Sequence, residues 1–358
     1  MTQAYAGDKS PIITGHFDVK ISSVAARALW YVNPSHAEIR ADTLHAQPND
    51  DCLVRALHSA VSRGTESLVF HGQVPESEYS RMRAPAMGGH FPFPVKYGYC
   101  HVGLVEQGPA ELEGQRVFSL WPHQTAFFAP AASLCRLPDA LPGNRAVLAA
   151  NMETALNAVW TAKVGPADRI AVVGGGVVGL LVAYLCGQLP GAQVTVIDLH
   201  RGRATLCHTL GVRYAHPEDL SDSGTDSPSA INNCDVVFHT SGHPAGLSTA
   251  LGLAGEEATV VELSWYGTRQ VEVPLGQAFH SRQLRLLSCQ VGHIEADHRP
   301  RWSYRRRLQA ALDLLLDDRL DHLLAPAVDF DRVPECLSQL LDPTHPALCQ
   351  VIDYPTRS

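Results

Sequence analysis

Three glycines at a fixed spacing give the clearest chemical signal in the chain. Gly174, Gly176 and Gly179 follow the apolar run RIAVV and open a second apolar run that begins with Val177 and Val178. In such a loop the first glycine makes a tight turn, the second lets the backbone approach a pyrophosphate, and the third lets a helix pack against a strand. The helix N-terminus would offer unpaired N–H groups to the phosphates. The spacing therefore predicts a dinucleotide-binding loop formed by these five residues.

An acidic residue follows at the distance that ribose recognition requires. Asp198 closes the next apolar run, QVTVIDL, about 20 residues beyond the loop. Its carboxylate would accept hydrogen bonds from the adenosine ribose and repel a 2′-phosphate, which favours NAD over NADP. Arg201 and Arg203 follow closely and could instead hold a phosphate. The alternative is a plain glycine-rich turn of an unrelated α/β protein, followed by a solvated helix start.

A second polar cluster lies in the stretch VKYGYCHVGLVEQG, residues 95–108. It could be a metal site, a catalytic tyrosine or a purely structural strand. A metal site would draw on Glu66, Cys100 and His101, with His71, His90 or His123. Zinc needs at least three converging protein ligands. Because Cys100 and His101 are adjacent on a predicted strand, they would point to opposite faces.

The elements that must position these residues change in type near Leu148. Before it, short β-like runs are broken by glycine and proline, which indicates a small barrel or sandwich. After it, apolar strands alternate with helical segments, which predicts a parallel sheet with right-handed crossovers. A chain of 358 residues suggests two domains.

Composition excludes several classes of protein. The net charge is −8 without a long charge run, so no nucleic-acid partner is expected. No apolar run reaches the roughly 20 residues of a membrane helix, and the first residues do not form a secretory signal. The nine cysteines are scattered and odd in number, which suits reduced thiols in the cytoplasm.

A β-rich N-terminal half, a dinucleotide fold and a return segment together resemble the medium-chain dehydrogenase/reductase superfamily, the alcohol dehydrogenase-like proteins. The resemblance is carried by GGGVVG with Asp198, by SRGTES at 62–67, and by VGLVEQG and TALNAVWTAKVG. It implies an α/β fold: a GroES-like β-rich catalytic domain plus a Rossmann domain with a doubly wound, six-stranded parallel sheet. The implied division is an N-terminal extension at 1–25, the GroES-like domain at 26–148 and 294–358, and the Rossmann domain at 149–293. The SRGTE and GYxxVG pieces are most similar to the branch that contains bacteriochlorophyllide dehydrogenase.

The sequence departs from the superfamily's zinc pattern at the ligand positions that can be placed. Arg63 stands where the first cysteine would be, and Tyr99 and Cys100 follow Gly98 where a His-Glu pair would be. Ala149 and Ala150 replace the third ligand, and WPHQTAFFAP contains no cysteine for a structural zinc. The resemblance thus implies NAD(P)-dependent hydride transfer, and we expect no zinc.

Without zinc, the alkoxide formed during carbonyl reduction needs another proton source. Tyr99 is the expected acid, and Lys96 or Arg63 could lower its pKa from about 10. Thr65 could relay a proton, and Glu66 could orient Arg63. The alternative is that Tyr99 only packs between the domains and Glu66 makes a structural hydrogen bond.

Further residues are expected near the cofactor or substrate on the basis of the resemblance. His123, in the loop that flanks the substrate, could donate a proton or contact the substrate, or could be an ordinary loop histidine. Thr154 could contact the nicotinamide ring or cap its helix. Thr240 and Ser241 end a strand at the edge where cofactors bind. Cys289 could touch the carboxamide, but no adjacent cation makes it a nucleophile.

An arginine-rich segment, RPRWSYRRR, follows the predicted dinucleotide fold. Arg299 and Arg301 could bind an anionic group of a substrate, and Trp302 could stack on a ring. Arg305, Arg306 and Arg307 extend the same cluster. The alternative is a solvated helix face.

The favoured function is a cytoplasmic, zinc-independent, NAD(P)-dependent oxidoreductase that moves a hydride between nicotinamide and a carbonyl or alcohol carbon of a polar, anionic, ring-bearing substrate. An enone or quinone reductase, and a non-catalytic NAD(P)H-sensing protein, stay open as alternatives. By analogy with the superfamily a homodimer is expected, with ATVVELSWYG as a pairing edge.

Overall fold

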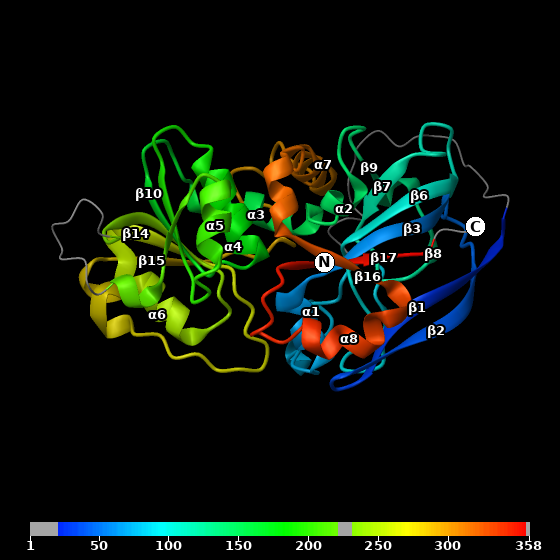
Figure 1. Cartoon of the computed structure of the whole chain (residues 1–358), viewed down its shortest axis with the longest axis horizontal. Coiled ribbons are helices and arrows are strands. Elements are labelled where there is room, and N and C mark those ends of the chain that lie inside the picture. Colours follow the sequence, from blue (N-terminus) through cyan, green and yellow to red (C-terminus); the bar gives the residue numbers. More distant parts are fainter. Residues whose placement is uncertain (1–20, 221–230, 356–358) are drawn as a thin grey trace. The chain divides into compact units, whose positions relative to one another are not determined.

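The computed structural model describes residues 21–220 and 231–355, and the chain divides into two compact units (Figure 1). Unit 1 comprises Met1–Ala150 and Trp302–Ser358, and unit 2 comprises Asn151–Arg301. The second boundary lies later than residue 293 because the backbone N–H of Glu295 donates to the side chain of Asn157 in unit 2. Residues 1–20 of the expected extension lie outside the described residues, and its last residues already belong to β1.

Unit 2 contains a six-stranded parallel sheet with the order β12-β11-β10-β13-β14-β15. Its strands are β10 (Arg169–Val173), β11 (Gln193–Ile197), β12 (Arg213–Ala215), β13 (Cys234–His239), β14 (Ala254–Glu262) and β15 (Arg285–Ser288). The central strands β10, β11 and β13 are mostly apolar because helices cover both faces of such a sheet. The predicted Rossmann sheet is confirmed. The strand in ATVVELSWYG, however, is β14, which pairs with β13 and β15 and is therefore not an edge.

Four helices accompany this sheet: α3 (Ala149–Ala162), α4 (Val177–Gly187), α5 (Arg203–Thr209) and α6 (Pro244–Leu253). The boundary between the units falls in the first turn of α3. Helix α4 packs on β10 and β11, and α6 packs on β10, β13 and β14. Val173, Val237 and Val260 from three strands meet Leu247 and Leu251 of α6 in one buried cluster. This core fixes the carboxyl ends of β10, β11 and β13, where the predicted cofactor residues lie.

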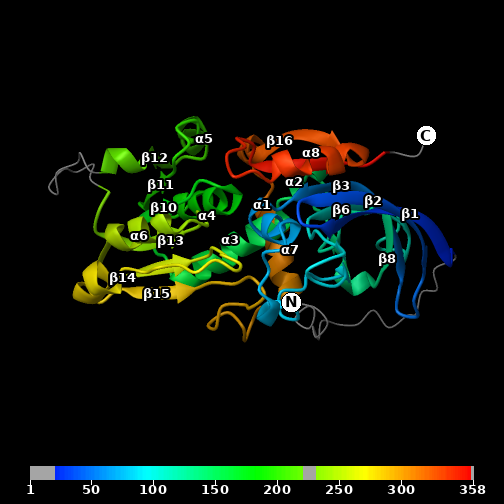
Figure 2. The same cartoon turned by 90° about the horizontal axis from the view of Figure 1, so that it is seen from below.

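Unit 1 is built from two largely antiparallel sheets, in agreement with the expected GroES-like β-rich domain. The strands of the first sheet are β1 (Ser23–Asn33), β2 (His36–His45), β4 (Gly88–Gly89) and β5 (Val95–Lys96), and β1 and β2 form its long blue hairpin (Figure 2). The second contains β3 (Cys52–Val61), β6 (His101–Gln107), β7 (Arg116–Ser119), β8 (Ala126–Ala129), β9 (Cys135–Arg136), β16 (Leu324–Asp329) and β17 (Cys349–Asp353). Strand β17 pairs with β3, so the return segment completes this sheet.

The helices of unit 1 are α1 (Arg63–Phe70), α2 (Gly143–Ala146), α7 (Tyr304–Leu314) and α8 (Val333–Leu340). Short segments of other helix types are η1 (Glu76–Glu78), η2 (Ala131–Ser133), η3 (Pro217–Leu220), η4 (Leu275–Phe279), η5 (Asp318–Leu323) and η6 (Phe330–Arg332), of which η3 and η4 belong to unit 2. All nine cysteines lie within the described residues, and none is in a disulfide. In the described ranges, no helix is both long and apolar enough to cross a bilayer.

Candidate cofactor site and active site

Two glycines of the motif, Gly174 in the loop between β10 and α4 and Gly179 in the first turn of α4, are required by packing. Gly174 has a φ of +113°, and a Cβ there would lie 2.6 Å from the backbone nitrogen of Ser241. A Cβ on Gly179 would lie 2.0 Å from the Gly174 carbonyl oxygen and 2.5 Å from the Thr240 Oγ1. The first glycine thus makes the turn and the third lets α4 approach the strand, as the spacing predicts.

Packing within the protein does not require a glycine at the middle position, Gly176. Gly176 is exposed, and no atom lies within 4 Å of the place where a Cβ would stand. It begins α4 without a side-chain cap, and the half-buried Val177 and Val178 form the first helical turn. Open space above an uncapped helix N-terminus is what a phosphate group needs. The loop therefore fits a pyrophosphate.

Asp198 closes this loop from the neighbouring strand. Its Oδ2 accepts the N–H of Gly175 at 2.6 Å, and its Oδ1 accepts the N–H of His200 at 2.8 Å. A Cβ on Gly175 would lie 3.2 Å from the Asp198 carboxyl. An ionised carboxylate has about four acceptor positions, so Asp198 can still accept ribose hydroxyls. Sequence reasoning missed Gly175, although the run GGG contained it.

The two arginines after Asp198 differ in their surroundings. The side chain of Arg203 lies beside Asp198; burial lowers the pKa of the Arg203 guanidinium, and the Asp198 charge opposes that effect. Arg201 forms exposed ion pairs with Glu218 at 3.3 Å and Asp219 at 3.4 Å. Arg203 is therefore the better placed of the two to meet a group held by Asp198.

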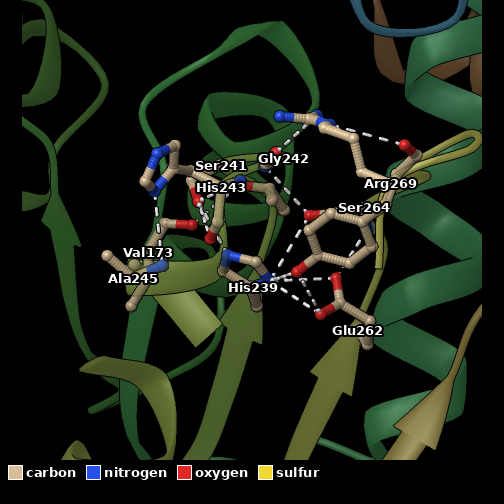
Figure 3. A network of polar contacts seen from close by, with 11 residues as sticks. Val173, His239, Ser241, Gly242, His243, Ala245, Glu262, Ser264 and Arg269 are labelled. Carbon is tan, nitrogen blue, oxygen red and sulfur yellow. Dashed lines mark hydrogen bonds and ion pairs between the residues drawn. The ribbon is translucent and has the colours of Figure 1, made fainter. Parts of the chain in front are cut away.

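Thr240 and Ser241 follow β13 and meet the glycine loop, as their position predicts. The Thr240 hydroxyl donates to the Gly174 carbonyl oxygen at 2.8 Å. Ser241 is exposed, and its Oγ lies 2.7 Å from Nε2 of the buried His239 (Figure 3). His239 was not expected from the sequence, because a histidine at the end of an apolar strand has no distinguishing pattern.

Thr154 and Cys289 both lie by α3. Thr154 is half-buried inside the helix that begins at Ala149, so the alternative that it caps this helix is wrong. The Cys289 sulfur is buried and lies 3.5 Å from both Asn157 Nδ2 and Thr161 Oγ1. Cys289 thus attaches the end of β15 to α3.

In unit 1, Glu66 is the centre of a buried network. Its carboxylate accepts hydrogen bonds from Tyr31 Oη at 2.6 Å, the Ser62 N–H at 2.7 Å and His123 Nε2 at 3.0 Å. Its side chain is 0% exposed. Burial by itself would raise the pKa of Glu66, but His123 and the three hydrogen bonds bring that pKa below its usual value. Glu66 is therefore a satisfied internal anion.

Arg63 has other partners than those expected. Its guanidinium donates to the backbone carbonyls of Asp342, His345 and Ala347. It joins α1 to the segment before β17. The expectation that Glu66 orients Arg63 is wrong, because Glu66 uses its oxygens on Tyr31, Ser62 and His123.

Tyr99 is half-buried, and its hydroxyl donates to Ser62 Oγ at 2.6 Å. Burial and the adjacent Cys100 raise the pKa of Tyr99, while hydrogen bonds with Ser62 and Thr65 act in the opposite direction. Thr65 is thus near enough for the expected relay. The expectation that Lys96 or Arg63 lowers the pKa of Tyr99 is wrong. Lys96 is itself largely desolvated, which lowers its own pKa.

His123 is 0% exposed, unlike the expected loop residue that touches substrate. Its Nε2 faces Glu66, and its Nδ1 lies 2.8 Å from Ser59 Oγ. Ser59 Oγ in turn lies 2.9 Å from Tyr354 Oη. Both ring nitrogens are therefore occupied inside unit 1, which leaves His123 no direct substrate contact. Ser59, Tyr354 and Tyr31 had no sequence signal, because they come from segments that are distant in the chain.

The side chains that a zinc ion would need do not fit. Across residues 21–220 and 231–355, no group of three or more His, Cys, Asp or Glu side chains is arranged to hold a metal. Burial raises the pKa of Cys100, which disfavours the thiolate form that binds zinc. The imidazole Nδ1 of His71 faces the Ser67 carbonyl at 2.7 Å. The alternative metal site is thus not assembled.

The arginine-rich segment does not form one cluster. Arg299 Nε donates to the Ile294 carbonyl at 2.7 Å, and Arg307 is fully buried. Arg306 lies 4.0 Å from the Trp302 ring centroid. Unit 1 contains a shallow cavity of about 380 Å³, which is lined by Trp302, Ser303, Arg305, Arg306, Gln309, Ala310 and Asp313.

Comparison with known proteins agrees with this fold. No family model matches the sequence. The chain is 24% identical over 222 residues to an uncharacterized zinc-type alcohol dehydrogenase-like protein of Haemophilus influenzae, covering 61% of this chain and 60% of the relative. It is 25% identical over 169 residues to 2-dehydro-3-deoxy-L-galactonate 5-dehydrogenase of Pseudoalteromonas atlantica, covering 47% and 49%. The chain thus spans between about half and three fifths of these relatives.

A solved structure extends the similarity to nearly the whole fold. L-idonate 5-dehydrogenase of Escherichia coli superposes with a TM-score of 0.73 at 15% identity, over 92% of this chain and 99% of that one. At this identity the likeness concerns the fold alone. The chain is thus similar in sequence to zinc-type alcohol dehydrogenase-like proteins and shares the fold of a solved dehydrogenase, in agreement with the expected resemblance to the medium-chain dehydrogenase/reductase superfamily.

Proposed function

We propose that this protein is a nicotinamide-dependent oxidoreductase that moves a hydride between the cofactor and a carbonyl or alcohol carbon of a polar substrate. The observation that carries the proposal is the turn from β10 into α4: it is open at Gly176, packing requires glycine at Gly174 and at Gly179 in α4, and Asp198 closes it. The similarity to dehydrogenases of sugar acids supports a polar substrate.

The cofactor is NAD or NADP, with a preference for NAD. Asp198 keeps acceptor positions for the ribose hydroxyls, which supports NAD. Arg203 lies beside it and would favour a 2′-phosphate. When bound, the nicotinamide ring supplies or accepts the hydride. The residues of unit 2 bind and orient it.

The reaction proceeds without zinc, and Tyr99 donates a hydrogen bond to the developing oxyanion. The zinc independence is supported by Arg63 and Glu66, whose side chains are committed to protein partners. A raised pKa keeps the Tyr99 phenol protonated at neutral pH, as a donor requires. Ser62 and Thr65 hold the hydroxyl in place.

The metal content of the protein tests the proposal that the reaction proceeds without zinc. Mass spectrometry of untagged protein purified without chelator should find far less than one equivalent of zinc, and a value near one would overturn the proposal.

The substrate carries an anionic group and a ring, with Arg299, Arg301 and Trp302 as its expected contacts. The cavity beside Trp302 and Arg306 supports a stacking site with a cation. A cytoplasmic location and a homodimer complete the proposal. Nine cysteines without a disulfide support a reducing compartment.

One observation favours a second candidate, an NAD(P)H-binding protein without turnover. Tyr99 has a raised pKa, whereas a general acid works best with a pKa near the working pH. This candidate predicts cofactor binding and no hydride transfer to any carbonyl compound.

Binding of NADH and NADPH, measured by fluorescence titration, tests the proposal first. Gly176→Ala should weaken binding about tenfold, or about 1.4 kcal/mol, because the new methyl group occupies the space of the pyrophosphate. The fold should be unaffected, since that space is open. Gly252→Ala in α6 is the matched control, because it also meets no atom within 4 Å. If the wild-type protein binds neither nucleotide, the proposed function is wrong.

A further inference from the structure

Beyond the glycine loop, unit 2 contains a chain of polar contacts at the ends of β13 and β14 (Figure 3). The Nδ1 of His239 lies 2.9 and 2.8 Å from the two carboxylate oxygens of Glu262, and its Nε2 lies 2.7 Å from Ser241 Oγ. The His239 side chain is 0% exposed and that of Glu262 is 16% exposed, whereas Ser241 is exposed. A half-buried glutamate and a buried histidine thus lead to the hydroxyl of an exposed serine.

Two further hydrogen bonds fix the carboxylate of Glu262. Glu262 also accepts the N–H of Ser264 at 2.7 Å and the Tyr266 hydroxyl at 3.1 Å. A Cβ on Gly246 of α6 would lie 2.2 Å from Ser241 Oγ and 2.7 Å from His239 Nε2, so the helix packs directly on this pair. The hydroxyl therefore has one fixed position.

Serine, histidine and a carboxylate in this order also occur in hydrolases, but a nucleophilic role does not fit here. Such a role needs backbone N–H groups that face the reacting oxyanion. The nearby N–H groups are already used: that of Gly242 on Ser264 Oγ at 3.0 Å and that of His243 on Ser241 Oγ itself at 3.2 Å. The arrangement orients a hydroxyl instead.

The direction of each hydrogen bond follows from these contacts. The Glu262 oxygens lie closer to Nδ1 of His239 than the Ser264 and Tyr266 hydroxyls, which are both at 3.4 Å. Because a carboxylate can only accept, Nδ1 carries a proton, and in the neutral ring Nε2 is an acceptor. The Ser241 O–H then donates to Nε2 at 2.7 Å rather than to the more distant His243 carbonyl at 3.4 Å. With the His243 N–H on one lone pair, Ser241 Oγ keeps one acceptor position.

The position of Ser241 in the sheet indicates which part of a dinucleotide its side chain would contact. Strands β11 and β13 flank β10 on opposite sides, and Asp198 follows β11 while Ser241 follows β13. With the adenosine ribose at Asp198 and the pyrophosphate at the loop on β10, the second half of the cofactor extends to the β13 side.

We infer that Ser241, oriented by His239 and Glu262, accepts a hydrogen bond from a hydroxyl of the second ribose, the one that carries the nicotinamide. The inference rests on the proposed dinucleotide binding. A ribose hydroxyl can donate to this oxygen, whereas a phosphate oxygen cannot. Ser241 is thus a positioning residue for the reactive end of the cofactor, and His239 and Glu262 act through it.

Two truncated ligands test this by isothermal titration: ADP, which lacks the second ribose, and ADP-ribose, which contains it. Ser241→Ala should weaken ADP-ribose binding about fivefold, the effect of one uncharged hydrogen bond, and leave ADP binding unchanged. Glu262→Gln should weaken ADP-ribose selectively to a smaller extent, because it loosens the histidine. Ser248→Ala, an exposed serine of α6, is the matched control and should change neither ligand.

An equal loss for both ligands in Ser241→Ala would place the hydroxyl at the adenosine or pyrophosphate part and overturn the inference. An unchanged ratio of the two affinities would overturn it as well. If the wild-type protein binds neither ADP nor ADP-ribose, the proposed function falls together with this inference. If the wild-type protein binds ADP but Ser241→Ala leaves the ratio of the ADP and ADP-ribose affinities unchanged, only the inference is overturned.

Discussion

The glycine loop of unit 2 and the Glu66 network of unit 1 are both polar and tightly constructed, but they differ in what they leave available. At the loop, Gly176 is exposed to open space, and Asp198 and Ser241 keep acceptor positions. In the network, Glu66 and His123 are fully buried and spend their hydrogen bonds on each other and on their neighbours. The first region has room and free acceptor positions for a ligand, whereas the second uses its polar groups to stabilise the unit, with the proposed donor Tyr99 at its border.

Removing the centre of the buried network should have the largest effect. Glu66→Ala leaves Tyr31, the Ser62 N–H and His123 without their acceptor in the core, so the free energy of unfolding of unit 1 should fall by about 3–5 kcal/mol. Urea unfolding followed by tryptophan fluorescence measures it. Glu113→Ala, at an exposed glutamate, is the control. A loss below about 1 kcal/mol would show that the network is not structural.

The role of Tyr99 separates the two regions most directly. Tyr99→Phe removes the hydroxyl and should lower kcat about 100-fold if it stabilises an oxyanion, equivalent to about 2.7 kcal/mol. NADH binding should stay at the wild-type affinity. Tyr97→Phe at the neighbouring buried tyrosine should leave kcat unchanged. An unchanged kcat in Tyr99→Phe would assign this residue to the structural network instead.

Adding a methyl group should lower the stability of unit 2 at the packed Gly179 but hardly at the open Gly176. Gly179→Ala forces a methyl group onto the Gly174 carbonyl and Thr240, so we expect a loss of about 1–3 kcal/mol in the unfolding free energy of unit 2. Gly176→Ala should cost much less, because its surroundings are empty. The difference between the two variants in thermal denaturation is the measurement. Equal losses would contradict the distinction between packing and ligand-facing glycines.

The smallest expected effect is a pH dependence of stability that comes from Glu66. Its pKa in the folded protein is lower than the ordinary value of 4.5, so its contribution is present above that value and is lost as the pH falls through the folded pKa. Glu66→Gln lacks this titration. The stability difference between the wild-type protein and Glu66→Gln should therefore shrink between about pH 5 and about pH 3. A constant difference over this range would show that the folded pKa is not lowered.

The sequence by itself determined the dinucleotide fold and the residues of its loop. Gly174, Gly176, Gly179 and Asp198 are close in the chain, and local rules for turns, helix starts and apolar strands are enough to place them. Runs broken by glycine and proline likewise predicted a small barrel or sandwich in the N-terminal half, although not its division into two sheets or the strand order.

Only the tertiary structure decided which polar groups face each other across distant segments. Glu66 lies in α1, while its partners Tyr31 and His123 come from β1 and from the loop before β8. His239 and Glu262 meet because parallel pairing places the ends of β13 and β14 side by side. Long-range hydrogen bonds depend on register and packing, which leave no spacing in the sequence. For that reason Arg63, Lys96 and His123 were expected in the wrong surroundings, and Ser241 was recognised without the histidine that holds it.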